Sequence, residues 1–131
     1  MLVKLFFYIG CTFIFTACLN KEESNRRDLA KTATEINEKC PKMLDSETRL
    51  DGIEVKEPNT LVYRYTLMNV LSQNVDTVRF YRMLWPGIIS NVKLSAEMKK
   101  LREANTVIEY FYQDKNSIPI YTFHINPEAY K

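Results

Sequence analysis

The sequence has little glycine, a single histidine and almost no net charge. Its 131 residues include 3 Gly and 1 His, and 18 Lys and Arg nearly balance 16 Asp and Glu. A net charge of +2 spread over both signs is unlike the basic surface of a nucleic-acid-binding protein. With so few glycines, the chain has no Gly-rich loop for phosphate groups. We therefore expect neither nucleic acid nor a loop-bound nucleotide as a partner.

The residues that are present indicate one small folded domain. Hydrophobic residues make up 46% of the chain, aromatic residues 12% and charged residues 26%. Disordered chains contain few aromatic residues and carry a high net charge, so that class is excluded. The length also fits a single domain.

A long hydrophobic run is missing as well. Lys4 precedes an apolar segment, Leu5–Phe15, and the small residues Thr16 and Ala17 follow. Counted as far as Leu19, the segment has 15 residues, whereas a membrane-spanning helix needs about 20. One charge, an apolar segment and small residues, in that order, are typical of a secretory signal peptide. We expect residues 1–17 to be removed on export.

The end of this segment, Phe15-Thr16-Ala17-Cys18, resembles a bacterial lipobox, with Phe15 where Leu is usual. The resemblance implies that Cys18 becomes the first residue and is acylated, palmitate included. The lipid would anchor the protein to a membrane of the bacterial cell envelope, on the periplasmic or the surface-exposed side of the outer membrane. The alternative is an ordinary signal peptide cut near Ala17, with Cys18 left as a thiol.

Polar residues after the lipobox predict a tether, residues 18–26, ahead of a single domain, residues 27–131. Within the tether, Lys21-Glu22-Glu23 is similar to the lysine-then-acidic signal that sends some Gram-negative lipoproteins to the cell surface. A charged linker without that meaning is the alternative.

Cysteine is too scarce to cross-link the domain. Cys11 lies in the signal peptide and Cys18 at the lipid position, which leaves Cys40 as the single thiol of the mature chain. No intramolecular disulfide is therefore expected, and burial of apolar side chains must stabilise the fold.

Hydrophobic periodicity predicts the secondary structure. Leu29, Ala33, Ile36 and Cys40 share one face of a helix that Pro41 ends. Residues rich in β-formers then predict two antiparallel hairpins, in the ranges 48–55 with 60–69 and 106–112 with 118–125.

Helices are expected between the hairpins. Apolar residues recur at helical spacing from Val78 to Val92, but Pro86 predicts a kink at Trp85 or two short helices. Ser95 can cap a further short helix that turns Met98 and Leu101 inward. The predicted fold is α+β, a four-stranded antiparallel sheet covered on one face by helices in the order α-ββ-αα-ββ.

Several segments together resemble a group of small, uncharacterised exported bacterial proteins. They are Glu35-Ile36-Asn37, Cys40-Pro41, Asp45, Thr48-Arg49-Leu50-Asp51, the run from Asn59 to Leu67, and the tail from Tyr110 onward. Ser117 stands where that group often has Gly. The resemblance implies export and a shared fold, and it assigns no role to any residue.

Two sets of residues could carry chemistry. Cys40 and His124 could form a thiol–imidazole pair, although a cysteine on an apolar helical stripe is usually a small buried residue. Asp45, Glu47 and Asp51 could supply an acid and a base, and Arg49 could hold an anion; a solvated turn with local ion pairs is the more common role. One histidine and one mature thiol cannot provide the ligands that zinc prefers, so we expect no metal and no cofactor.

Tyrosines are the candidates for binding. Tyr63, Tyr65, Tyr110 and Tyr112 lie on predicted strands, so a sheet face left open would be aromatic and could bind a partner, together with Arg49 and Asp51. The alternative is that these rings fill the core. The sequence thus favours a non-catalytic envelope lipoprotein that binds another envelope protein, as an assembly factor or inhibitor does. A small envelope enzyme that uses the acidic cluster is the alternative.

Overall fold

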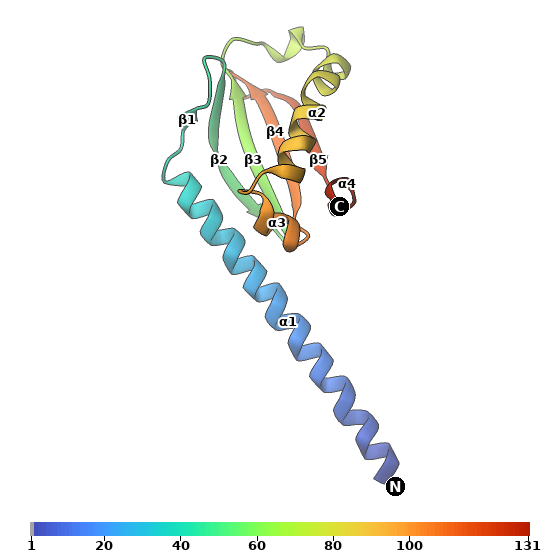
Figure 1. The fold of residues 1–131 in the computed structure, drawn as a ribbon. Helices are drawn as coiled ribbons and strands as arrows, with labels where there is room; N and C mark the ends of the chain where they lie inside the picture. The colour runs from blue at the N-terminus through green and yellow to red at the C-terminus, as the bar shows by residue number, and fades with distance from the viewer. Residues whose placement is uncertain (1) are drawn as a thin grey trace.

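The computed structural model describes the backbone of residues 2–131 and the side chains of residues 18–131. The predicted signal peptide, residues 1–17, lies outside the residues whose side chains are described. The elements in chain order are α1 Leu2–Asn37, β1 Lys42–Met43, β2 Thr48–Lys56, β3 Thr60–Leu67, η1 Ser72–Asn74, α2 Thr77–Leu94, α3 Lys99–Glu103, β4 Val107–Asp114, β5 Pro119–Ile125 and α4 Pro127–Tyr130. The helices lie over one face of a single sheet (Figure 1).

The α+β class is confirmed, but the sheet differs from the predicted one. Strands lie in the order β1-β2-β3-β4-β5, and the β2/β3 and β4/β5 pairs are antiparallel as expected. The two central strands, β3 and β4, are parallel, so the prediction of four antiparallel strands was wrong. Helices α2 and α3 return the chain to the end of the sheet where β3 began, and such a crossover makes the next strand parallel. The two-residue β1 is an additional edge strand.

The helices follow the predicted apolar stripes, except that α1 ends at Asn37, so Cys40 lies beyond the helix that was predicted to include it. Leu29 and Ala33 of α1 are buried, as are Met98 and Leu101 around α3. Residues 18–26, predicted as a tether, are a mostly exposed part of α1. Of the two outcomes predicted at Pro86, a kink at Trp85 or two short helices, the second is excluded, because α2 is one helix with Pro86 inside it.

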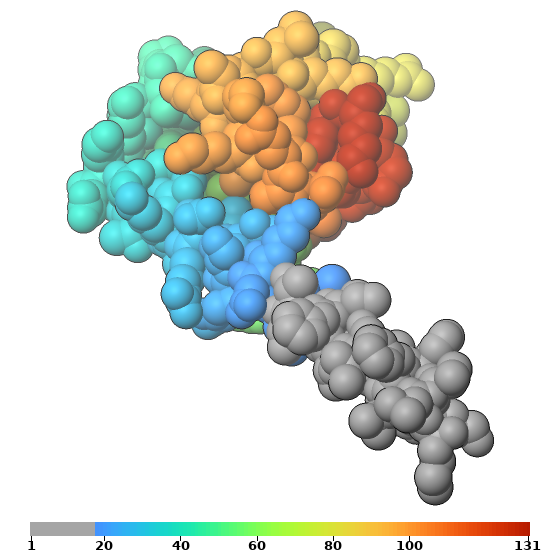
Figure 2. All heavy atoms as spheres, turned by 60° about the horizontal axis from the view of Figure 1, so that its bottom comes forward, coloured from blue at the N-terminus to red at the C-terminus, as the bar shows by residue number. Residues whose placement is uncertain are grey.

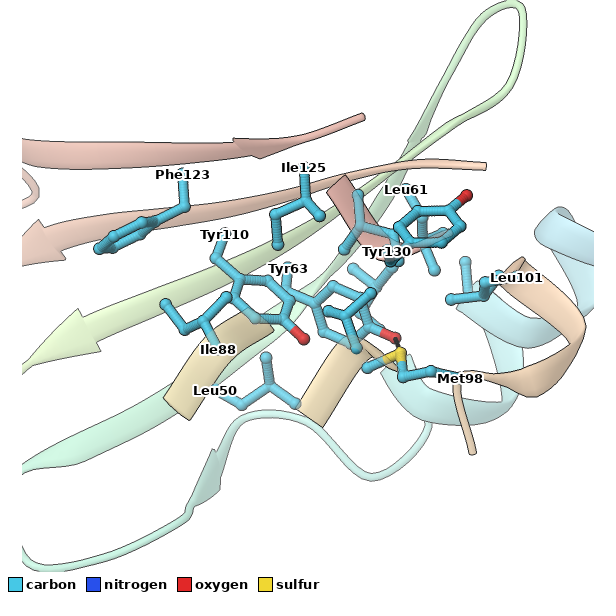
Figure 3. Close-up of a cluster of buried hydrophobic side chains, with 14 of the residues drawn as sticks. Leu50, Leu61, Tyr63, Ile88, Met98, Leu101, Tyr110, Phe123, Ile125 and Tyr130 are labelled. Carbon is cyan, nitrogen blue, oxygen red and sulfur yellow. Dashed lines mark hydrogen bonds between the residues drawn. The ribbon is translucent and has the colours of Figure 1, made fainter. Parts of the chain in front are cut away.

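The core lies between the sheet and the helices (Figure 3). Its fully buried members come mainly from the central strands and β5, including Leu61, Ile108, Phe123 and Ile125. Ile88 of α2 points onto Tyr110 from the helix side. Burial of these side chains holds the domain together without a disulfide, in line with the free thiol of Cys40.

One buried carboxylate ties the loops at the far end of the sheet. Asp114 is 1% exposed, and its oxygens accept the backbone N–H groups of Ser72 at 2.9 Å, Asn116 at 2.8 Å and Ile118 at 3.0 Å. The bond from Ser72 is the main cause of the lowered pKa of this carboxyl group. Ser117 in the same turn has φ 63°, a left-handed conformation that glycine adopts freely.

The side chain of Asn37 joins the end of α1 to β2. Its amide nitrogen donates to the Ile53 carbonyl at 2.8 Å, and its oxygen accepts the Ile53 N–H at 2.6 Å. Asn37 thereby takes the place of a neighbouring strand along this part of β2. A Cβ atom on Gly52 would lie 2.9 Å from the Asn37 oxygen, so only glycine allows this close approach.

We predict that Gly52→Ala lowers the free energy of unfolding by about 1–3 kcal/mol, because the new methyl group displaces Asn37 and leaves the Ile53 backbone groups without partners. In an Asn37→Ala background the same change should cost much less, and chemical denaturation of the four variants measures the coupling. Gly87→Ala is the control: nothing lies within 4 Å of the added Cβ, and alanine should stabilise α2 by about 0.5–1 kcal/mol. Additive costs for Gly52 and Asn37 would contradict the prediction.

Candidate binding site

The predicted tyrosines lie on the covered face of the sheet. Parallel pairing sets Tyr63 beside Tyr110 and Tyr65 beside Tyr112, all on the side that the helices cover. Tyr63, Tyr110 and Tyr112 are only 8%, 6% and 9% exposed. Their rings pack on one another, with Tyr63 and Tyr110 edge to face at 5.1 Å and Tyr65 stacked on Tyr112 at 5.0 Å. The interpretation of an open aromatic face is thus corrected, because these rings fill the core.

Burial also governs the chemistry of these phenols. It raises the pKa of Tyr63 and of Tyr112 to about 12. The same cause raises the pKa of Tyr65 and of Tyr110. All four hydroxyl groups therefore keep their protons at neutral pH, which makes them poor acid–base groups.

The open face of the sheet carries a polar network around Asp51. One carboxylate oxygen accepts the Arg49 guanidinium at 2.6 Å, and the other accepts the Thr66 hydroxyl at 2.5 Å. The Gln113 amide donates to the Thr66 hydroxyl oxygen at 3.1 Å. Arg49 and Asp51, two of the predicted site residues, are thus brought together, and they pair with each other.

A second polar row crosses the open face nearer to its other end. Glu109 accepts Lys56 at 3.0 Å and lies 3.1 Å from the Nδ1 atom of His124. Arg64 pairs with Glu54 and covers the ring of Phe111, 4.5 Å from its centroid. These charges largely compensate one another across neighbouring strands, as solvated sheet faces commonly do.

The predicted acidic cluster does not form one site. Asp45 lies in the loop before β2, where its carboxylate accepts the N–H groups of Glu47 at 2.8 Å and Thr48 at 2.7 Å; these bonds lower its pKa. Asp51 lies on the sheet face within its own network, and the side chain of Glu47 is exposed. Asp45 and Asp51 therefore each stabilise their own local structure, and the enzyme interpretation gains no support.

Cys40 and His124 lie at opposite edges of the sheet. Cys40 follows α1 beside β2, is half-buried, and has a thiol pKa that burial raises. His124 is on β5, which is the edge strand at the other side of the sheet from β1. The two side chains therefore do not form a nucleophile and base. Among the residues whose side chains are described, no group of three His, Cys, Asp or Glu could hold a metal ion.

A groove runs between α1 and α3, visible between the blue and orange atoms of Figure 2. Its volume is about 440 Å³, and Leu29 and Leu101 form its apolar floor. The remaining lining residues are Lys21, Asn25, Asp28, Lys31, Thr32, Glu35, Lys100, Glu103 and Ala104. Such a groove can take a few apolar side chains of a partner while charged groups on both rims contact its polar side chains.

Charges on the rims of this groove differ in how they are paired. Lys31 lies 3.9 Å from Glu35 along α1, and Glu103 pairs with Lys99 along α3. In the part of the chain with described side chains, Lys21, Asp28 and Lys100 take part in no ion pair. Charges of both signs thus remain available to a ligand.

Sequence reasoning missed this groove for a geometric reason. Its walls are two helices that are about 65 residues apart in the chain, and they meet only because the crossover places α3 beside α1. Leu29 and Leu101 each fit an apolar stripe in the sequence, but a stripe does not reveal which helix lies next to it.

The profile of one protein family, a domain of unknown function (DUF8479), matches residues 24–120. The chain belongs to this family. The match includes the α1 wall of the groove from Asn25 onward and the whole α3 wall. No curated protein sequence matches the DUF8479 chain.

Three solved structures share the fold of this DUF8479 protein. A Pseudomonas aeruginosa protein described as secreted has 15% sequence identity and a TM-score of 0.66, covering 85% of this chain and 96% of the other. The pilotin EpsS of the Vibrio vulnificus type 2 secretion system has 10% identity and a TM-score of 0.69, covering 86% and 96%. The type II secretion system pilotin AspS of Vibrio cholerae has 8% identity and a TM-score of 0.66, covering 86% and 98%. At these low identities, TM-scores of 0.66 to 0.69 establish a common fold.

Among the described residues of this DUF8479 protein, no helix combines the length and the apolar character that crossing a bilayer requires.

The buried phenols predict alkaline unfolding. Because the folded pKa of Tyr63 and Tyr112 is raised from 10.0 to about 12, their stabilising contribution is complete below pH 10 and is lost as the pH rises toward 12. Tyr112→Phe should therefore move the alkaline unfolding midpoint, measured by circular dichroism, to higher pH. Phenolate absorbance, compared with the protein in denaturant, follows ionisation directly. Ionisation of every tyrosine near pH 10 without unfolding would contradict this prediction.

Proposed function

We propose that this protein is a non-catalytic, lipid-anchored module of the bacterial cell envelope that binds a protein component of a secretion system. The observation that carries the proposal is the fold, shared over 86% of the chain with pilotins of two Vibrio secretion systems. A fold can host several functions, so the site must supply further support.

The groove between α1 and α3 supplies that support. Its apolar floor suits a short apolar ridge on a partner segment, and its unpaired Lys21, Asp28 and Lys100 suit charges of opposite sign beside that ridge. An amphipathic helix or a short extended segment has this arrangement. We assign the partner site to this groove in place of the tyrosines, whose rings pack on one another in the core.

Membrane attachment follows from the resemblance of residues 15–18 to a lipobox. Cys18 is exposed near the start of the described side chains, and Leu29 is the first buried residue after it. An acyl chain on Cys18 would therefore be free to enter a membrane without disturbing the core. Residues 1–17 would be the signal peptide and residues 18–26 the exposed link between lipid and domain.

Lipid attachment predicts the behaviour of one variant. Cys18→Ser removes the acyl acceptor, so partitioning of the exported protein into the detergent phase should disappear. Cys40→Ala is the matched control and should leave partitioning unchanged. Mass spectrometry of the mature N-terminus provides the direct measurement, and an unmodified Cys18 would end the proposal of a lipid anchor.

Groove binding predicts a contrast between two threonines of α1. Thr32 lines the groove and is half-buried, whereas Thr34 is exposed and bonds its hydroxyl to the Ala30 carbonyl. Thr32→Trp should fill the groove and weaken partner binding at least tenfold, which is about 1.4 kcal/mol. Thr34→Trp should have little effect.

The measurement is affinity capture of the intact protein and its two variants from envelope extracts, with the bound proteins identified by mass spectrometry. Melting temperatures near that of the parent show that both variants fold. Equal capture of a secretion-system protein by all three forms would exclude the groove. Capture of no such protein by the parent would contradict the proposed function itself.

A further inference from the structure

Strand β5 is an open edge of the sheet. It pairs with β4 on one side, and among the described residues no strand pairs with it on the other (Figure 1). Helix α4 follows β5 but turns back toward the start of β4, where the Tyr130 hydroxyl donates to the Thr106 carbonyl at 2.8 Å. Alternate N–H and C=O groups of Ile120–Ile125 therefore point outward without a strand to bond.

The opposite edge of the sheet, in contrast, is protected. There, β1 pairs with Arg49 and Leu50, and Asn37 bonds the Ile53 backbone. Natural edge strands are usually short, charged or covered, and β1 has only two residues, one of them Lys42. By comparison, Ile120–Ile125 contains no Lys, Arg, Asp or Glu, and the only proline of β5 is its first residue.

An apolar stripe of α2 borders this open edge. Val78, Tyr81, Trp85 and Ile89 share one flank of the helix. Tyr81 and Trp85 stack on Phe123 of β5, at 5.7 and 6.4 Å between ring centroids, which fixes this flank above β5. Val78 is 58% exposed and the other three are half-buried, so large apolar surface remains beside the unpaired backbone groups.

We propose that β5 pairs antiparallel with β5 of a second copy of this chain, about a two-fold axis beside Thr122, to form one continuous sheet. A two-fold interface requires a patch that complements itself. Because the strand carries no Lys, Arg, Asp or Glu, antiparallel pairing sets no such like charges opposite each other. The edge strand alone, about 23 Å long, falls short of the roughly 800 Å² per partner of a stable interface; the α2 stripes of both copies add the missing apolar area.

Disulfide trapping in the full chain tests the geometry. Thr122 is at the centre of β5, and the two-fold axis sets its two copies about 4.5–5.5 Å apart at Cα, within the range of a disulfide. In a Cys40→Ala background, Thr122→Cys should give a disulfide-linked species of twice the chain mass under mild oxidation. Ser90→Cys, at an exposed position of α2, is the matched control and should not. Absence of the Thr122→Cys dimer, or a cross-link to a different protein, would overturn the proposal.

Charge repulsion provides a second test of the proposed dimer. Light scattering of the full chain in detergent should give a dimer for the parent and for Ser90→Lys, and loss of the dimer for Thr122→Lys, whose two ammonium groups would face each other across the axis. Circular dichroism checks that the Thr122→Lys protein is folded; if it is not, the trapping experiment decides. A monomeric parent protein would overturn the proposal without affecting the proposed groove, since the groove lies on α1 and α3.

Discussion

The packing of aromatic rings between the sheet and α2 is the interaction on which the remaining structure depends. Phe123 contacts Tyr81, Trp85 and Tyr112, and is 1% exposed although it belongs to an edge strand. Each well-oriented aromatic pair contributes about 0.5–1.5 kcal/mol beyond the area that it buries. A domain without a disulfide needs such a contribution to its stability. The tyrosines that provide it are packed in the core and are therefore not available to bind a partner at the surface.

Polar ties complement this packing at both ends of the sheet. At one end, the carboxylate of Asp114 joins the β4–β5 turn to the segment that leads into α2. At the edge, the amide of Asn37 joins α1 to β2. Both side chains bond backbone groups that would otherwise lack partners, so each fixes the position of an element as well as its contact with the core. The groove depends on the second tie, because Asn37 ends the helix that forms one groove wall.

Local features of this fold could be predicted from the sequence, and long-range ones could not. The alternation in residues 60–67 and 107–112 marks the strands, and the stripe through Leu29 and Ala33 marks a buried helix face. The parallel pairing of β3 and β4 depends on the path of the chain through two helices, which periodicity does not encode. The tyrosines were assigned to strands correctly, but which face the helices cover is decided by that same path. Asp51 shows the limit for the site: its partners Thr66 and Gln113 come from β3 and β4, so only the sheet register reveals that these side chains meet.

The unbroken course of α1 sets the reach of the molecule. A helix advances about 1.5 Å per residue, so the groove residues of α1, from Lys21 to Glu35, lie about 5 to 26 Å along the axis from Cys18. With a lipid on Cys18, a flexible tether would let the groove sample many heights and orientations, whereas a helical one acts as a spacer of fixed length. A segment bound in the groove would then sit close to the bilayer surface, and the anchor would select partners by their distance from the membrane as well as by their sequence.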